Sequence, residues 1–220
     1  MELIERFINV FEGLNRAHGV TIVNESNENG SKVKGKSFVK REIITQEHWL
    51  NHLQGKASLG VIPINDDNKC KWGCIDIDSY AGFDHKKLIN KIQNLKLPLI
   101  VFRSKSGGAH VFLFTSDYVS AALMQDKLNE IRSVLGYGGS EVFPKQRELK
   151  SKDDTGNFLN LPYFNGDNTT RYAFNNNGDA VNLEDFFVIH KSNSIDAEVL
   201  KDLKLKDLKP LIQTDRLVLN

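Results

Sequence analysis

The chain has 220 residues, 40% of them hydrophobic and 26% charged, and its formal net charge is +1. The length suits one large domain, or a core with a small appendage, and the composition is ordinary for a folded, soluble protein. No stretch approaches the roughly 18 apolar residues of a membrane span. The balanced charge does not by itself indicate nucleic-acid binding, although basic residues gather at 32–41 and 145–152.

The N-terminal segment and the cysteines indicate an intracellular protein. Residues 1–14 carry acidic side chains and no small-residue cleavage site, so they do not form a secretory signal. Cys70 and Cys74 lack nearby partners at zinc-site spacing, which favours two reduced thiols, one of them buried. We therefore expect a cytoplasmic location.

The first third of the chain predicts a helix, a loop, a second helix and two strands. The first helix is indicated by apolar residues at helical spacing: Leu3, Ile4, Phe7, Ile8, Phe11 and Leu14. The polar residues 24–36 indicate a mobile loop or a hairpin tip. Thr45 is expected to cap a short helix that Gly55 ends. Strands are then predicted at 58–64 and 72–78, joined by a turn.

The rest of the chain predicts two helices, a hairpin and several short strands. The helices have these apolar faces: Phe83, Leu88, Ile89, Ile92 and Leu95 in one, and Met124, Leu128, Ile131 and Leu135 in the other. Between them, two β-rich runs flank a Gly-Gly pair, which is a strong hairpin signal. Short strands are predicted near 140–143, 158–163 and 170–174, and a charged helical segment from about residue 183.

This order of elements predicts a mixed α+β fold rather than a doubly wound sheet. We expect one domain over residues 1–190. The helical tail over 191–220 is expected to be a linker or a docking segment.

The segment KWGCIDIDSY, residues 71–80, places two carboxylates one residue apart in an apolar run. Alternate side chains of a strand share a face, so Asp76 and Asp78 point together, and Cys74 joins them if the alternation holds. Two like charges about 7 Å apart repel each other unless a cation lies between them. The pair predicts a metal site; the alternative is a strand that ends at the surface, with both acids in solvent.

The turn SKSGGAH, residues 104–110, has the composition of a phosphate-binding loop. Gly107 and Gly108 allow positive φ and a close approach of backbone N–H groups to phosphate. The other ligands would be hydroxyls of Ser104 and Ser106, the charge of Lys105 and a ring N–H of His110. A plain hairpin turn would need the glycines but neither both serines nor the histidine. Taken alone, His110 is more readily explained as a satisfied histidine beside the sheet, which is the commoner fate of a lone histidine.

Glu141, in the sequence SEVFPKQ, is a third candidate ligand. Two carboxylates on one strand and a third from a neighbouring strand can hold two Mg²⁺ or Mn²⁺ ions roughly 4 Å apart. Such a pair of ions activates an attacking hydroxyl and stabilises the leaving oxygen of a phosphoryl transfer. On its own, Glu141 is more readily explained as one solvated acid among the 28 acidic residues of the chain.

The order of these motifs, IDID, SKSGGAH and a strand acid, resembles the archaeo-eukaryotic primase superfamily, the catalytic domains of primases and primase-polymerases. The longer context over about residues 45–175 is similar to the primase branch of TOTE conflict systems and of related phage and mobile-element primases. The resemblance implies a primase-type core, with an RRM-like catalytic half and a smaller N-terminal αβ half. It also implies a prokaryotic or phage-infected host cell.

The resemblance assigns roles to two sets of residues. The metal ligands and catalytic residues are Asp76, Asp78 and Glu141. The nucleotide-binding residues are Ser104, Lys105, Ser106, Gly107, Gly108 and His110, with Lys145 and Arg171 as further contacts to phosphate or template. For Lys145 and Arg171, ordinary surface cations are the alternative.

Two positions depart from the pattern of the family. Motif two is often Ser-x-His, whereas Gly108 stands two residues before His110, so the serine role falls to Ser106 or Ser104. Motif three is often an aspartate, and Glu141 is one methylene longer. Glu148 is a competitor for this role, but it lies in a charged run typical of a solvated segment.

The implied activity is template-directed nucleotidyl transfer, by a DNA primase or primase-polymerase that makes or extends primers from NTPs or dNTPs. The implied partners are a single-stranded DNA template and a helicase, in cis or in trans, and the implied cofactors are two Mg²⁺ or Mn²⁺ ions. Tyr163 and Asn160 are candidates for a contact to the sugar.

Two other functions stay open. A metal-dependent nuclease would need similar carboxylates but no triphosphate cradle. A non-catalytic nucleic-acid-binding adaptor on an RRM-like scaffold would stack bases on aromatic residues of its central strands. In this chain the matching strand carries carboxylates, which repel phosphate in the absence of metal.

Overall fold

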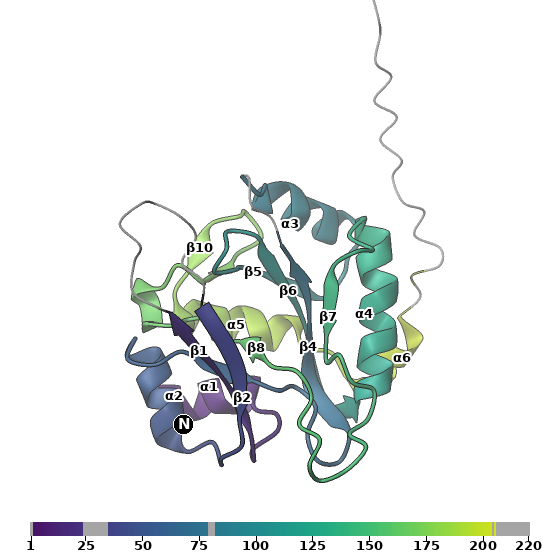
Figure 1. Cartoon of the computed structure of the whole chain (residues 1–220). Coiled ribbons are helices and arrows are strands. Elements are labelled where there is room, and N and C mark those ends of the chain that lie inside the picture. Colours follow the sequence, from purple (N-terminus) through teal and green to yellow (C-terminus); the bar gives the residue numbers. More distant parts are fainter. Residues whose placement is uncertain (1, 24–34, 79–81, 204, 206–220) are drawn as a thin grey trace, which may run out of the picture.

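Figure 1 shows a computed structural model that describes residues 2–23, 35–78, 82–203 and 205. The α-helices of these residues are α1 (Leu3–Phe11), α2 (Gln46–Leu53), α3 (His85–Asn94), α4 (Ala121–Leu135), α5 (Leu183–Asn193) and α6 (Ala197–Asp202). The strands are β1 (His18–Val23), β2 (Gly35–Lys40), β3 (Leu59–Val61), β4 (Lys69–Ile77), β5 (Leu99–Arg103), β6 (Ala109–Ser120), β7 (Glu141–Phe143), β8 (Leu159–Asn160), β9 (Ala173–Phe174) and β10 (Ala180–Val181). The α+β class is therefore confirmed. Most of the predicted loop at 24–36, and the tail after residue 205, lie outside the described residues.

The described strands form two antiparallel sheets. A four-stranded sheet has the order β2-β1-β3-β8, and a six-stranded sheet has the order β10-β9-β5-β6-β4-β7. Strands β5 and β6 form the predicted hairpin. Strands β3 and β4, which are neighbours along the chain, belong to different sheets, so the chain passes from one sheet to the other after residue 61.

The helix ends follow their sequence signals. Thr45 is the N-cap of α2, and Gly55 beyond its end has a φ of +73°. Gly136 ends α4 in the left-handed region at φ +83°, where a side chain would be strained. Among the described residues, no helix is both long enough and apolar enough to cross a membrane.

The six-stranded sheet is buried on both faces. One face packs against α3 and α4, and in Figure 1 α4 stands beside β4 and β7. The other face carries an aromatic cluster around Phe11 of α1, whose ring lies 5.8–6.5 Å from five aromatic rings of β4, β5, β6 and α5. Cys70 and Cys74 are both buried, on opposite faces of β4, so the expectation of a single buried thiol was wrong. The register of β4 shifts between Cys70 and Trp72, so these two thiols, four residues apart, face opposite sides of the sheet instead of the same side.

The C-terminal helices pack on this core. Helix α5 buries Leu183, Phe186 and Phe187, and α6 buries Leu200. The expected division of the chain between residues 190 and 191 falls within α5. That division stays a prediction.

Candidate active site

Three motif residues stand side by side across neighbouring strands. Asp76 of β4 is in register with His110 of β6 on one side and with Glu141 of β7 on the other. The His110 Nε2 atom lies 3.2 Å from the Asp76 Oδ1 atom. Two residues further along, the same three strands place Cys74, Phe112 and Phe143 in the aromatic cluster. Asp76, His110 and Glu141, called here the cross-strand row, therefore continue that face of the sheet beyond the edge of its core.

The cross-strand row opens into a cavity of about 680 Å³ between the two sheets, called here the inter-sheet cavity. The six-stranded sheet and its turns contribute Asp76, Asp78, Ser104, Lys105, Ser106, His110, Glu141, Phe143, Lys145 and Arg171. The opposite wall consists of Ser37, Phe38 and Val39 from β2 and Asn157, Phe158, Leu159 and Asn160 at β8. Gly107 and Gly108 shape the turn without lining the cavity. The structure thus brings the other predicted site residues to one place.

Phe158 reaches the cavity wall because two glycines leave room for its ring. Gly19 of β1 and Gly60 of β3 are paired across the four-stranded sheet. A Cβ atom on Gly19 would lie 2.0 Å from the Phe158 ring, and one on Gly60 would lie 2.3 Å from it. Any larger residue at these positions would displace the aromatic ring from the wall of the cavity.

The carboxylates surround the cavity rather than meet at one point. The oxygens of Asp76, Asp78 and Glu141 do not all lie within 4.8 Å of one another, although all three residues are described. Glu141 is 59% exposed, and its Oε2 atom lies 2.7 Å from the Nζ atom of Lys145. The backbone of Glu141 is next to Asp76, so a rotation of this exposed side chain would bring its carboxylate toward the aspartates.

The turn of motif two is held by backbone hydrogen bonds. The Ser104 N–H donates to the Gly108 carbonyl at 3.0 Å, and the Gly107 N–H donates to the Ser104 carbonyl at 3.1 Å. Gly107 has a φ of +92°, which explains why glycine stands there. The hydroxyls of Ser104 and Ser106 lie 3.1 Å apart and both residues line the cavity.

His85, the first residue of α3, supports this turn and was missed in the sequence. Its Nε2 atom lies 2.9 Å from the carbonyl oxygen of Gly108. The contact joins residues 23 positions apart, so it cannot be predicted from a local pattern in the sequence. Its only sequence signal is a histidine directly after the N-cap Asp84.

Two cations of the cavity are not paired with acids. In the described part of the chain, neither Lys105 nor Arg171 forms an ion pair. The Arg171 guanidinium donates to the Ser58 hydroxyl at 3.2 Å, and burial lowers its pKa below the ordinary value. Burial, and then the charge of Arg171, lower the pKa of Lys105. Unpaired positive charge in a partly buried wall favours the binding of an anion.

The other candidates of the sequence fall into two groups. Asn160 lines the cavity and accepts a hydrogen bond from the Thr21 hydroxyl at 3.2 Å. Tyr163 is fully buried, and its hydroxyl donates to the carbonyl of Val181 at 3.0 Å, so it does not reach the cavity. Glu148 is exposed and outside the cavity lining.

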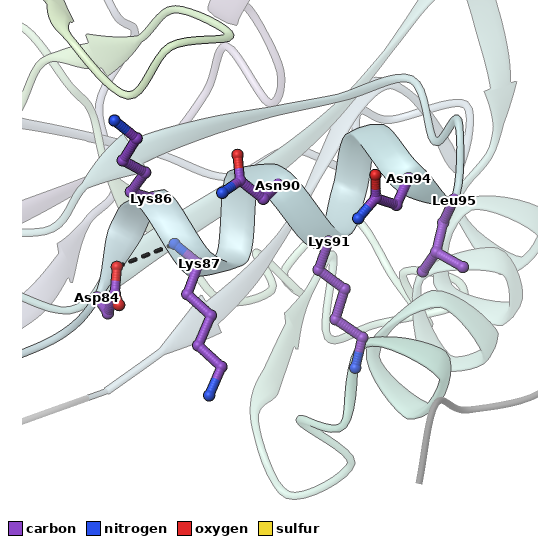
Figure 2. A pocket seen from close by; sticks show the side chains of 7 residues that line it. All are labelled: Asp84, Lys86, Lys87, Asn90, Lys91, Asn94 and Leu95. Carbon is purple, nitrogen blue, oxygen red and sulfur yellow. Dashed lines mark hydrogen bonds between the residues drawn. The ribbon is translucent and has the colours of Figure 1, made fainter. Parts of the chain in front are cut away.

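A second hollow, of about 550 Å³, runs along α3 (Figure 2). Its lining consists of Asp84, Lys86, Lys87, Asn90, Lys91, Asn94 and Leu95. The one carboxylate in this lining, that of Asp84, caps α3 by accepting the Lys87 N–H at 2.9 Å. None of the motif residues belongs to this lining. The hollow along α3 therefore has lysine side chains but none of the residues of the cross-strand row.

The family model described as the TOTE conflict system, archaeo-eukaryotic primase domain, matches residues 15–202. None of the curated proteins matches the chain. The matched range contains the cross-strand row, the turn of motif two and every residue that lines the inter-sheet cavity. The resemblance seen in the sequence is confirmed: the chain belongs to the family of archaeo-eukaryotic primase domains of TOTE conflict systems.

Proposed function

We propose that this domain is a template-directed nucleotidyltransferase, a primase or primase-polymerase that joins nucleotides on a single-stranded DNA template. One observation carries the proposal. The acids of the cross-strand row and the phosphate-type turn line the same cavity, where a nucleotide's α-phosphate and its triphosphate tail could be bound together. In this interpretation the six-stranded sheet is the RRM-like catalytic half, and the four-stranded sheet is the smaller half.

The acids fit the metal that the family implies. Asp76, Asp78 and Glu141 offer hard carboxylate oxygens at the cavity, which is the donor type that Mg²⁺ and Mn²⁺ prefer. When bound there, such ions would lower the pKa of an attacking 3′-hydroxyl and neutralise charge on the phosphate oxygens. Lys145 balances the charge of Glu141 before nucleotide arrives, because its ammonium lies on that carboxylate.

The turn and its cations would hold the triphosphate. Ser104 and Ser106 offer hydroxyl donors, and His110 offers a ring N–H beside Asp76. Lys105 and Arg171 line the cavity and supply positive charge that forms no ion pair with an acid of the described residues. Fixing the triphosphate at several points orients the α-phosphate, and such positioning is a large part of the catalysis of phosphoryl transfer.

The opposite wall would hold the base and the template. Phe38 of β2 is 39% exposed and lines the cavity. An aromatic face in this place can stack on a base of any sequence. An adaptor that reads RNA would need such aromatic residues in the central strands of the six-stranded sheet, where this chain has Asp76 and His110.

The test is primer synthesis and extension on single-stranded DNA, with NTPs and then dNTPs, under Mg²⁺ and Mn²⁺. We expect Asp78→Asn and Glu141→Gln to lose incorporation by roughly 100-fold or more, since each removes a charged metal ligand. Glu148→Gln is the matched control, because this acid is exposed and outside the cavity. It should stay within about twofold of the wild type.

Two results would reject the proposal. One is full incorporation by Asp78→Asn with circular dichroism unchanged. The other is shortening of the labelled strand with no lengthening when nucleotides are added, which would identify a nuclease.

A further inference from the structure

The four-stranded sheet carries a cluster of metal-ligating side chains outside the inter-sheet cavity. His18 belongs to β1, Glu42 follows β2, and His48 belongs to α2. The Oε1 atom of Glu42 lies 3.5 Å from His18 Nε2 and 3.3 Å from His48 Nε2. The ligand atoms of all three residues lie within 4.8 Å of one another. None of them lines the inter-sheet cavity. We call these residues the His–Glu–His cluster.

The spacing of these atoms suits a tetrahedral ion. Metal–ligand bonds of about 2.0–2.1 Å at tetrahedral angles place neighbouring ligand atoms about 3.3–3.4 Å apart. The two measured separations, 3.3 and 3.5 Å, match that value. Two imidazoles and one carboxylate are a donor set typical of zinc-type ions, and Mg²⁺ prefers oxygen donors instead.

The surroundings of the two histidines point the same way. His18 is only 3% exposed, so its ring is held in place by the packing around it. The His48 Nδ1 atom lies 2.9 Å from the Thr45 hydroxyl, the kind of outer contact that orients a ligating imidazole.

We propose that His18, Glu42 and His48 bind one zinc-type divalent ion, with water in the fourth position. The ion ties α2 to the β1–β2 hairpin. Because β2 also provides Ser37, Phe38 and Val39 to the inter-sheet cavity, the ion stiffens one wall of that cavity. Its role is structural, and the reacting groups lie elsewhere.

Lys40 is the natural competitor of this ion. Its Nζ atom lies 2.7 Å from the same Oε1 atom of Glu42, and its side chain is 53% exposed. An incoming ion displaces the ammonium to solvent. A hydrogen-bonded network is the other arrangement that the atoms allow, since the Thr45 N–H lies 3.1 Å from His48 Nδ1. In that network His48 donates from Nε2 to Glu42, and no ion binds.

The experiment is a titration of the full chain with Co²⁺, followed by its visible absorption, in excess Mg²⁺ to occupy the oxygen ligands of the inter-sheet cavity. We expect one equivalent of Co²⁺ with a tetrahedral spectrum. Glu42→Gln, at a residue that is 35% exposed, should weaken binding at least tenfold without unfolding the chain. Glu47→Gln, at an exposed acid of α2 next to His48, is the matched control and should bind as the wild type does. Lys40→Gln should bind severalfold more tightly, because the competing ammonium is gone.

Two further measurements separate this site from the inter-sheet cavity. The double variant Asp76→Asn/Asp78→Asn should keep the tetrahedral Co²⁺ spectrum. Zn²⁺ should raise the melting temperature of the wild type and of Glu47→Gln, but not that of Glu42→Gln. A wild type without a tetrahedral spectrum, or a Glu42→Gln variant that binds as tightly as the wild type, would overturn the inference.

Discussion

The cross-strand row and the His–Glu–His cluster lie in different sheets and offer different atoms. The row presents partly exposed carboxylates to a cavity of about 680 Å³. The cluster presents two ring nitrogens and a single carboxylate, and its His18 is almost fully buried. Oxygen-rich sites suit ions that exchange with their substrate phosphates, whereas imidazole ligands suit zinc-type ions. The comparison predicts two independent metal sites in one chain: the cross-strand row serves the reaction, and the His–Glu–His cluster stabilises the fold.

The largest effect should come from Asp76, the centre of the cross-strand row. We expect Asp76→Asn to lower nucleotide incorporation roughly 100- to 1000-fold, because the variant loses a metal ligand and the charged partner of His110. The stabilisation by Zn²⁺ should be unchanged. Glu42→Gln should show the reverse pattern, with incorporation within about threefold of the wild type. If Asp76→Asn also abolished the Zn²⁺ effect, the two sites would not be separate.

The next effect is the loss of stability in acid on the side of the four-stranded sheet. Buried His52 accepts the Leu59 N–H at Nδ1, and its Nε2 atom lies 2.7 Å from the Pro162 carbonyl, so a neutral ring satisfies both contacts. Burial lowers the pKa of His52 to about 4. Between this value and the unfolded pKa of about 6.5, the unfolded chain binds more protons than the folded chain. This stability is therefore present above pH 6.5 and is lost as the pH falls toward 4, by up to roughly 3 kcal/mol.

Urea unfolding at pH 7, 5.5 and 4.5 measures that loss, and hydrogen exchange locates it. The amide of Leu59, which donates to His52, should lose protection at a higher pH than the amide of Val111 in the centre of the six-stranded sheet. If both amides lost protection at the same pH, acid would destabilise the two sheets alike, contrary to this prediction.

The smallest of the three effects concerns Arg171, the half-buried cation of the inter-sheet cavity. A charge-assisted hydrogen bond contributes about 1.5–3 kcal/mol, so Arg171→Ala should raise the KM for nucleotide by roughly tenfold or more. Arg147→Ala is the matched control, because Arg147 pairs with Asp126 on the surface, outside the cavity. Steady-state extension at increasing nucleotide concentration measures both. Equal KM values for the two variants would mean that Arg171 does not contact the nucleotide.

Local patterns in the sequence predicted the elements and part of the site. The apolar spacing and caps predicted α1, α2 and α4, and the Gly-Gly pair predicted the β5–β6 hairpin. The alternation of β4 predicted that Asp76 shares a face with Cys74, which the burial of Cys74 in the aromatic cluster agrees with. These features depend on neighbours within a few residues, which is why a single sequence carries them.

Contacts between distant residues could not be predicted in this way. The pairing of Gly60 with Asn160 places β8 in the four-stranded sheet, and no local signal specifies a partner a hundred positions away. Two other features could not be predicted for the same reason, because each joins residues that are distant in sequence. They are the packing of the Phe158 ring against Gly19 and Gly60 and the contact of His85 with the turn of motif two. The His–Glu–His cluster has irregular spacing along the chain, so it becomes visible only when β1, β2 and α2 are assembled.

Because both native thiols are buried, a cysteine introduced on the surface of this protein could be labelled selectively. Cys70 and Cys74 are fully buried; burial raises the pKa of Cys70 to about 12 and that of Cys74 well above its ordinary value. Since maleimides react with accessible thiolates, neither residue should be modified in the native fold. In the variant Ser37→Cys, on the β2 wall of the inter-sheet cavity, the new cysteine would carry the fluorophore while the two native cysteines stay unlabelled. Its emission would report in real time when a nucleotide enters between the sheets.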